Sequence, residues 1–372
     1  MTLRKAVLAS LGLCMLSIPP AVANDGDVAV EIAYTADALW NTQGGIKTGG
    51  RYLDNLDLTL EAGVGDGVVF VYGIYNNSTE FSATLVGDSQ TVSNIDSGEH
   101  FRIYEAWYLH PFARGEGSIK AGLIDLNSEF DATETAGLFL NSSHGIGPDF
   151  SQTGENGPSI FPSTSLAVRV DYQLSDQLKV RIGAFDAVPN DPDRPKRMKL
   201  SWDEGTLLAG ELDFGKVSEV RVVAGVWSYT SAFETIQGAM EDGNWGGYTL
   251  MEGALYREPE DEGRGLNAWV RTGFAENTNI NDFKSYFGAG VVYTGLFDGR
   301  EADLLGLSVA SVWQGDPAKR QALAAGDETA SKEITLEVTY RIVVNDWLTL
   351  QPDIQYIVNP GIVGGADNAL VM

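Results

Sequence analysis

Cysteine is almost absent from the chain, because Cys14 is the only one among 372 residues. This excludes a disulfide scaffold and a zinc site built from cysteines. Basic residues are also few: 25 Lys and Arg stand against 51 Asp and Glu, which gives a formal net charge of −26. So strong an acidic excess repels phosphates and argues against a nucleic-acid-binding protein. The hydrophobic content of 44% argues equally against a disordered chain.

Long hydrophobic runs are missing as well. Beyond the N-terminal segment, no stretch approaches the roughly 18 apolar residues that a transmembrane helix requires. Helical periodicity is scarce. The three histidines (His100, His110 and His144) are too widely separated for a zinc site, and no nucleotide-binding fingerprint occurs. We therefore expect no metal site and no cofactor.

The N-terminus has the pattern of a Sec signal peptide. Two basic residues near the start precede a short apolar run, which is followed by Ala-Val-Ala at 21–23. A charged start, a short apolar run and small residues at a cleavage site are typical of such peptides. We expect residues 1–23 to be removed, together with Cys14, and residues 24–372 to form the mature protein outside the cytoplasm.

Alternation with a period of two dominates the remaining chain. In 166–173, for example, apolar Val168 and Val170 alternate with Arg169 and Asp171. This pattern is typical of strands with two unlike faces. It predicts fifteen strands, near 27–39, 52–63, 68–76, 101–110, 117–125, 165–174, 178–186, 206–214, 217–229, 247–257, 265–275, 284–295, 304–314, 332–342 and 347–358.

The connections between these strands alternate in length. Those that follow even-numbered strands are mostly tight turns. Those that follow odd-numbered strands are long: 77–100, 126–164, 187–205, 230–246 and 315–331. A sandwich has no reason to gather its long loops at one end, whereas an outer-membrane barrel has short periplasmic turns and long extracellular loops. The fold class that we predict is all-β, a transmembrane antiparallel β-barrel.

Two details complete the predicted barrel. Bacterial barrels have an even number of strands, so a sixteenth should begin near Asn368, and we expect this last strand to be cut short at Met372. Aromatic residues near strand ends are typical of the interfacial girdles. The candidates for these girdles are Tyr172, Phe214, Trp227, Phe274, Tyr340 and Tyr356.

The stretch from Gly122 to Val170 resembles the carbohydrate-selective porin family of the OprB type. It contains GLIDLNSEF, then FLNSSHGIGP, and returns through PSTSLA. RIYEAW at 102–107 matches the preceding strand of that family, and VNPG at 358–361 matches the approach to its last strand. The resemblance implies a sixteen-stranded outer-membrane porin through which sugars diffuse.

A porin of this kind selects by pore width, hydrogen-bonding groups and charge in the lumen. We expect loop 126–164 to fold inward as the constriction, because its phenylalanines and leucines favour burial; an external, disordered loop is the alternative. The loop and the strand end before it contribute these candidate lumen or sugar-contact residues: Asp125, Asn127, Glu129, Asp131, Asn141, His144 and Asp149.

The inward faces of the strands contribute the remaining candidates: Arg102, Glu105, Trp107, Arg169, Lys179, Arg181 and Arg271. Arg169 and Arg181 lie on adjacent predicted strands and could form a basic strip opposite the loop. Trp107 has the same parity as Glu105 and is either a stacking surface for sugars or a lipid-interface anchor. Arg102 has the opposite parity, so it lies at the rim or requires a bulge.

The sequence thus predicts an outer-membrane porin for mono- and small oligosaccharides, without catalytic residues. A general or small-organic-acid porin of the same fold is the first alternative, and a barrel-shaped enzyme or adhesin is the second. A Ser-His pair of His144 with Ser142 or Ser143 is weak evidence for an enzyme, since neighbouring positions in a loop supply no orienting third group. The expected partners are permeating sugars, outer-membrane lipid and lipopolysaccharide, and no nucleic acid; the sequence leaves the oligomeric state open.

Overall fold

The computed structural model describes residues 28–189 and 199–372. The predicted signal peptide, residues 1–23, lies outside the described residues. Within them no helix is long and apolar enough to cross a bilayer. The strands are β1 (Val28–Gly45), β2 (Gly49–Val64), β3 (Gly67–Asn77), β4 (Glu99–Phe112), β5 (Gly117–Ile124), β6 (Ser165–Ser175), β7 (Leu178–Asp186), β8 (Thr206–Gly215), β9 (Val220–Glu234), β10 (Met240–Glu258), β11 (Asp261–Ala275), β12 (Phe283–Thr294), β13 (Leu304–Gln314), β14 (Lys332–Asn345), β15 (Leu348–Leu350), β16 (Asp353–Val358) and β17 (Asp367–Val371).

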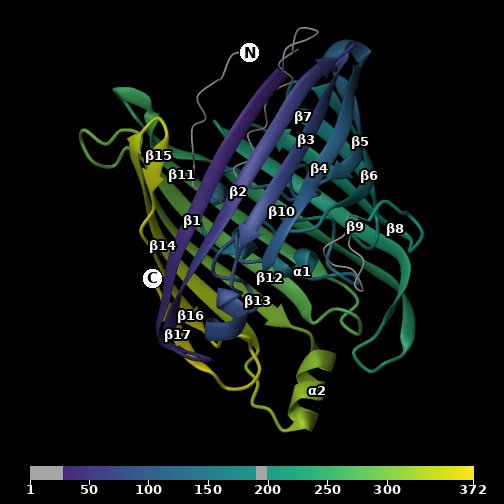
Figure 1. Ribbon diagram of the computed structural model, residues 1–372, viewed down its shortest axis with the longest axis vertical. Coiled ribbons are helices and arrows are strands. Elements are labelled where there is room, and N and C mark those ends of the chain that lie inside the picture. The colour runs from purple at the N-terminus through teal and green to yellow at the C-terminus, as the bar shows by residue number, and fades with distance from the viewer. Residues whose placement is uncertain (1–27, 190–198) are drawn as a thin grey trace.

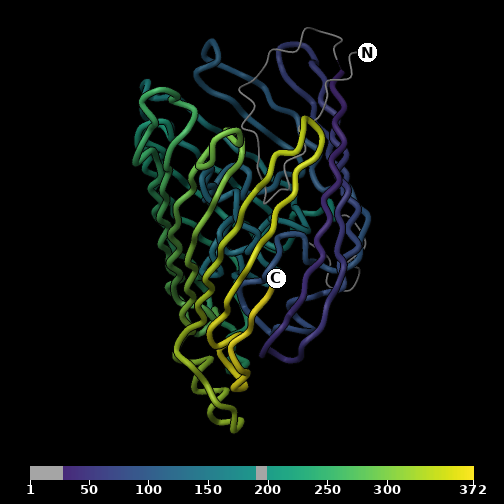
Figure 2. Tube along the Cα trace, turned by 90° about the vertical axis from the view of Figure 1, so that its left-hand side faces the viewer, coloured from purple at the N-terminus to yellow at the C-terminus, as the bar shows by residue number. Residues whose placement is uncertain are grey.

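The strands form one antiparallel sheet that closes on itself (Figure 1). From β1 to β14, each strand pairs with the next along the chain. The last strand, β17, pairs with β16 through Tyr356↔Leu370 and with β1 through Asn41↔Val371, and Figure 2 shows the C-terminus beside the purple β1. Closure leaves the paired part of the sheet without a free edge.

All fifteen predicted strands are confirmed, with one of them divided in two. The strand predicted over 347–358 consists of β15 and β16, which pair in succession with β14. Pro352 lies at the break and has no backbone N–H to donate to the ladder. The two short pieces therefore occupy the place of one strand in the barrel wall. The last strand, β17, begins at Asp367, close to the position predicted for the sixteenth strand.

Long connections gather at one end of the barrel, the lower end in Figure 1, from which α2 (Asp316–Ala325) projects. The tight turns lie at the opposite end, as the alternation in length predicts. The long connection predicted over 230–246 is wrong. There β9 runs on to Glu234 and β10 begins at Met240, because the alternation of buried and exposed side chains continues into both segments.

The two faces of the sheet differ as the alternation predicts. On β6, Val168 and Val170 are exposed on the outer face, whereas Arg169 is buried inside. The assignment of Trp227 to an interfacial girdle is wrong: it is 2% exposed and stacks on Phe150 inside the barrel, with ring centroids 5.0 Å apart. Its position on β9 has inward parity, which explains the difference.

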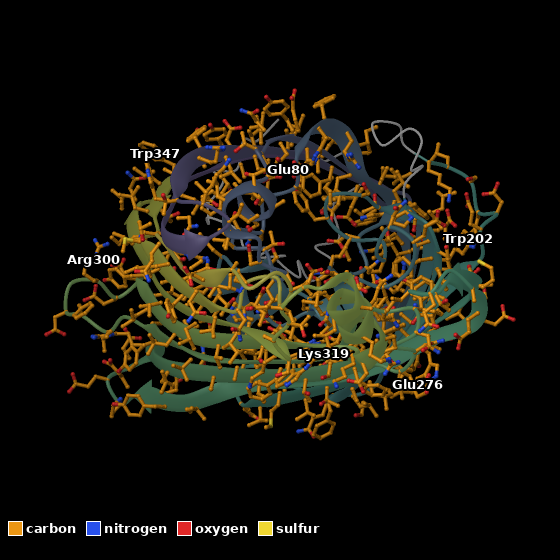
Figure 3. All side chains as sticks on the ribbon, turned by 90° about the horizontal axis from the view of Figure 1, so that it is seen from below. Glu80, Trp202, Glu276, Arg300, Lys319 and Trp347 are labelled. Carbon is orange, nitrogen blue, oxygen red and sulfur yellow. The ribbon has the colours of Figure 1, made fainter. Side chains whose placement is uncertain are left out.

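Two connections fill much of the interior. We name residues 125–164, between β5 and β6, the inner loop, and residues 78–98, between β3 and β4, the second loop. Viewed from the long-loop end, Glu80 of the second loop lies within the ring of strands, whereas Trp202, Glu276 and Arg300 lie at its outer edge (Figure 3). These two loops position the candidate site.

Candidate functional site

The inner loop is packed against the inside of the barrel wall. Phe130 and Phe150 are fully buried, and Phe139 is 2% exposed. They belong to apolar clusters that include wall residues such as Trp227 and Trp269. The short helix α1 (Pro148–Ser151) contacts β11 and β12. Burial of these aromatic rings holds the loop inside the barrel, since each ring would otherwise expose a large apolar surface to water.

The Asp-x-Asn-x-Glu-Phe segment at the start of the inner loop forms a tight turn. The Asp125 carboxylate accepts a hydrogen bond from the backbone N–H of Asn127 at 2.9 Å. The Asn127 side-chain amide donates to three carbonyls of the loop, at Phe130, Asp131 and Gly145. The conformation of the loop therefore depends on Asp125 and Asn127, while Glu129 is directed at the wall.

Glu129 joins the inner loop to three cationic side chains of the wall. Its carboxylate accepts from Lys120 of β5, lies 3.0 Å from Nε of Arg169 on β6 and 3.6 Å from Nε of Arg181 on β7. Burial alone would raise the pKa of Glu129, but these three cations outweigh it and hold the pKa well below its usual range. Arg181 is also paired with Glu211 of β8. The predicted basic strip thus exists as a pair of arginines, and it is neutralised by carboxylates.

A second ion-pair cluster lies deeper along the loop. The Arg271 guanidinium of β11 donates to both oxygens of Asp131, at 3.1 and 2.6 Å, and also to Asp149. The rings of Tyr248 and Tyr286 lie 5.5 and 5.2 Å from the guanidinium carbon. Burial raises the pKa of Asp131 to about 7, although Arg271 acts in the opposite direction.

Wall glutamates hold the two loops through the loop backbone. Each carboxylate accepts hydrogen bonds from backbone N–H groups of a loop. The pairs are Glu105 with Asp125, Glu211 with Asp131, Glu252 with Glu134 and Thr135, Glu337 with Leu140 and Asn141, and Glu333 with Ser89 and Gln90, all between 2.6 and 3.2 Å. Buried N–H groups need such acceptors, so these glutamates fix the path of each loop.

Asn141 and His144 belong to this packing. Asn141 donates to the side chain of Gln355 at 3.2 Å, and its own oxygen accepts from Ser143. The His144 ring lies between Phe139 and Trp269 and is 2.8 Å from the Ser308 hydroxyl of β13. Burial lowers the pKa of His144 to about 3, so the imidazole is neutral. Ser143 is bonded elsewhere, and the two residues do not form a nucleophile and base.

A bulge in β4 brings Arg102 and Glu105 onto the same face. The pairing with β3 shifts between Tyr72↔Glu105 and Gly73↔Ile103, so Tyr104 is the extra residue. Beyond the bulge, Trp107 points inward and stacks on Phe70 at 4.8 Å, and the ammonium of Lys120 lies 4.1 Å from its ring. Trp107 is therefore on the lumen side rather than at the lipid interface.

The predicted site residues fall into two groups. Eight are buried in the packing of loop against wall: Glu105, Asp125, Asp131, Asn141, His144, Asp149, Arg169 and Arg271. Six are partly exposed inside the barrel: Arg102, Trp107, Asn127, Glu129, Lys179 and Arg181. Of these, Glu129 and Arg181 are engaged in the ion pairs described above, and Arg102 donates to Ser163 of the inner loop.

Sequence reasoning did not find Glu211, Glu252 and Glu333, nor the inward folding of the second loop. The second loop packs Phe81, Leu85 and other apolar side chains against β1, β2, β16 and β17. Two patterns in the sequence could have indicated these features. Glutamates stand at inward positions of several strands, twice on β14, and five large apolar residues recur between 81 and 95 in a stretch long enough to be a loop.

Comparisons with known proteins agree with this architecture. The profile of the family described as "Carbohydrate-selective porin, OprB family" matches residues 55–372. Porin B of Pseudomonas aeruginosa is 25% identical over 394 residues, which cover 92% of this chain and 85% of that protein. The high-pH structure of OprB from Pseudomonas putida is similar with a TM-score of 0.82 at 21% identity, over 92% of both chains. The outer membrane channel DcaP of Acinetobacter baumannii has a TM-score of 0.58 at 13% identity, over 94% of this chain and 97% of that one.

Proposed function

The chain belongs to the carbohydrate-selective porin family of the OprB type and is an outer-membrane carbohydrate porin, and from this premise we propose that the inner loop forms its constriction. Mono- and small oligosaccharides pass the loop on the side where the wall and loop side chains remain partly exposed. Arg102, Trp107 and Asn127 are the residues that contact the sugar there. The family and the fold are those of a channel rather than of an enzyme.

The observation that carries this proposal is the attachment of the inner loop to the wall by buried ion pairs and backbone hydrogen bonds. Glu129 and Asp131 of the loop are bound by cations of β5, β6, β7 and β11. A loop that is held in this way cannot move aside for a solute. It therefore defines a fixed narrow passage in which hydrogen-bonding groups select the permeant.

The partly exposed residues have the chemistry that a sugar requires. Arg102 supplies a planar fork of donors for hydroxyl oxygens. Trp107 stacks on Phe70 and has the Lys120 ammonium 4.1 Å from its ring, so a sugar meets the partly exposed edge of the indole. The side-chain amide nitrogen of Asn127 donates hydrogen bonds to carbonyls of the loop. Its partly exposed side chain lies at the surface of the loop that the sugar passes.

The remaining partners follow from the outer surface and from the N-terminus. Exposed apolar side chains of the strands, such as Val170, Ile182 and Leu212, contact outer-membrane lipid, and the long-loop end faces lipopolysaccharide. Residues 1–23 act as the Sec signal peptide. The acidic balance of the chain disfavours nucleic acid as a partner.

Swelling of liposomes that contain the purified protein tests this function. We expect rapid swelling in isotonic solutions of a hexose and slow swelling with a trisaccharide, because the fixed loop restricts size. Equal rates for sugars and for small organic acids of similar size would favour a general porin instead. An absence of swelling with every sugar would contradict the proposal.

A further inference from the structure

A hollow of about 600 Å³ lies at the short-turn end of the barrel, between the inner loop and the wall of β6–β9. Three of its lining residues, Gln173, Lys179 and Asp213, are side by side on β6, β7 and β8 in the register Gln173↔Lys179↔Asp213. Glu134 of the inner loop and Lys216 of the turn between β8 and β9 also line it. The hollow is thus formed by wall, turn and loop together.

The hollow begins where the ion-pair network of the inner loop ends. The preceding inward row of the same strands is Asp171↔Arg181↔Glu211, in which Arg181 is paired with Glu211. Two residues along a strand span about 7 Å. A solute that has passed the inner loop toward the short-turn end therefore next meets the row formed by Gln173, Lys179 and Asp213.

Several side chains of the hollow have unused hydrogen-bonding capacity. Among the residues that the structure describes, Glu134, Lys179 and Lys216 make no side-chain hydrogen bond or ion pair. Asp213, by contrast, is held by two hydrogen bonds of 2.9 Å from Arg221. The hollow thus offers two ammonium donors and one carboxylate acceptor, at positions that the packing of the protein does not use.

We infer that this hollow is an exit subsite for neutral carbohydrates, an inference that rests on the proposed function. A sugar hydroxyl both donates and accepts, so it is served by lysines and a glutamate around one space. The lining carries three cations (Lys179, Lys216 and Arg221) and three carboxylates (Glu134, Asp176 and Asp213), so a charged sugar gains no net attraction. The volume lies within the range of small-molecule sites.

The subsite also suits release. Its lining contains a valine and no aromatic ring, so a sugar is held there by hydrogen bonds alone. Conduction requires binding that is strong enough to attract the permeant and weak enough to let it go. The subsite takes the sugar from the narrow passage and presents it to the periplasm.

Protection of an introduced cysteine tests whether sugar occupies the hollow. Removal of residues 1–23 takes away Cys14, so Lys216→Cys supplies the reactive thiol. It should react with a maleimide added from the short-turn side, and glucose should slow this reaction by a factor of about ten. Asp66→Cys, in the turn between β2 and β3, lies outside the hollow and is the matched control, whose labelling glucose should not change. Equal labelling of Lys216→Cys with and without glucose would overturn the subsite.

Single-channel recording with glucose on one side separates the subsite from the proposed function. Lys179→Ala should require about tenfold more glucose for half-block from the short-turn side, with little change from the long-loop side. Lys319→Ala, in the projecting helix α2, is the control and should behave as the wild type. Block of the wild type from the long-loop side, with Lys179→Ala unchanged from both sides, would overturn only the subsite. An absence of block in the wild type from either side would overturn the proposed function and the subsite with it.

Discussion

Arg181 connects the wall and the inner loop at the level of a single residue. Its guanidinium is paired with Glu211 of β8 and lies 3.6 Å from Glu129 of the loop. Val180 and Ile182 on the same strand face outward, and an arginine on the lipid face would cost about 2–4 kcal/mol at mid-membrane. The side chain therefore has both a reason to point inward and two carboxylates to receive it.

Replacing Arg181 with alanine should weaken sugar block of the channel about tenfold, because the loop that shapes the passage loses one of its cationic anchors. Conductance of small cations should rise at the same time, since a positive charge is removed while the carboxylates remain. Planar-bilayer recording with and without glucose measures both effects. Arg300→Ala, at the outer edge of the short-turn end, is the control; an Arg181→Ala channel with unchanged block and unchanged cation preference would show that Arg181 has no part in selectivity.

Asp131 should make the ion selectivity depend on pH. Its pKa is raised by burial to about 7 while Arg271, Asp149, Glu211 and Tyr248 surround it. As the pH falls through this value the carboxyl takes up a proton, Arg271 keeps its charge, and the interior loses one negative charge. Preference for cations should therefore decrease between about pH 8 and about pH 6.

Reversal potentials in a salt gradient measure this preference. In Asp131→Asn the preference should already be lower at the higher pH, and acidification should change it less than in the wild type. If the variant kept the full pH-dependent step, another group would be responsible for it.

At the scale of elements, the inner loop owes its position to acceptors on the strands. Glu337 alone accepts from the N–H groups of Leu140 and Asn141, at 2.6 and 3.2 Å. Because β14 carries both Glu333 and Glu337, one strand holds the second loop and the inner loop together. The two loops therefore depend on a common part of the wall.

Glu337→Ala should loosen the inner loop, since two buried N–H groups lose their acceptor at a cost of roughly 1–3 kcal/mol each. The expected result is a channel that still folds and inserts but shows larger current noise and brief closures at constant voltage. Glu276→Ala, an exposed position at the long-loop end, should leave the noise at the wild-type level. Quiet recordings from Glu337→Ala would contradict this account of loop attachment.

The sequence predicts the elements better than their contacts. Alternation identifies the strands because only one face of each meets lipid, and Pro352 is the reason why one of them divides. Alternation also places Arg169 and Arg181 inside, but it contains no information on which carboxylate of the inner loop or of a neighbouring strand each will meet. Pairs such as Arg271 with Asp131 join residues from distant parts of the chain, and only the closed barrel brings them together.

For the whole molecule, the formal charge of −26 is compatible with a barrel interior that contains many ion pairs. Many of the scarce basic residues lie inside, where they are paired with carboxylates, as Lys120, Arg169, Arg221 and Arg271 are. Buried cations without such partners would be costly. The acidic excess of the chain is thus compatible with an interior in which positive and negative groups alternate along the wall.

Export of the protein should remove residues 1–23. N-terminal sequencing of the protein from outer-membrane fractions should return Asn24 as the first residue, because Ala-Val-Ala precedes it at 21–23. A sequence that begins at Met1 would contradict the assignment of a signal peptide.

Passage of sugars beside a fixed inner loop can be measured as the current through single channels in a planar bilayer while glucose is added. We expect glucose to reduce the ion current in a saturable manner, because a sugar bound beside the inner loop occupies the passage of the ions. A current that is independent of glucose concentration, from a protein that has inserted and conducts ions, would contradict it.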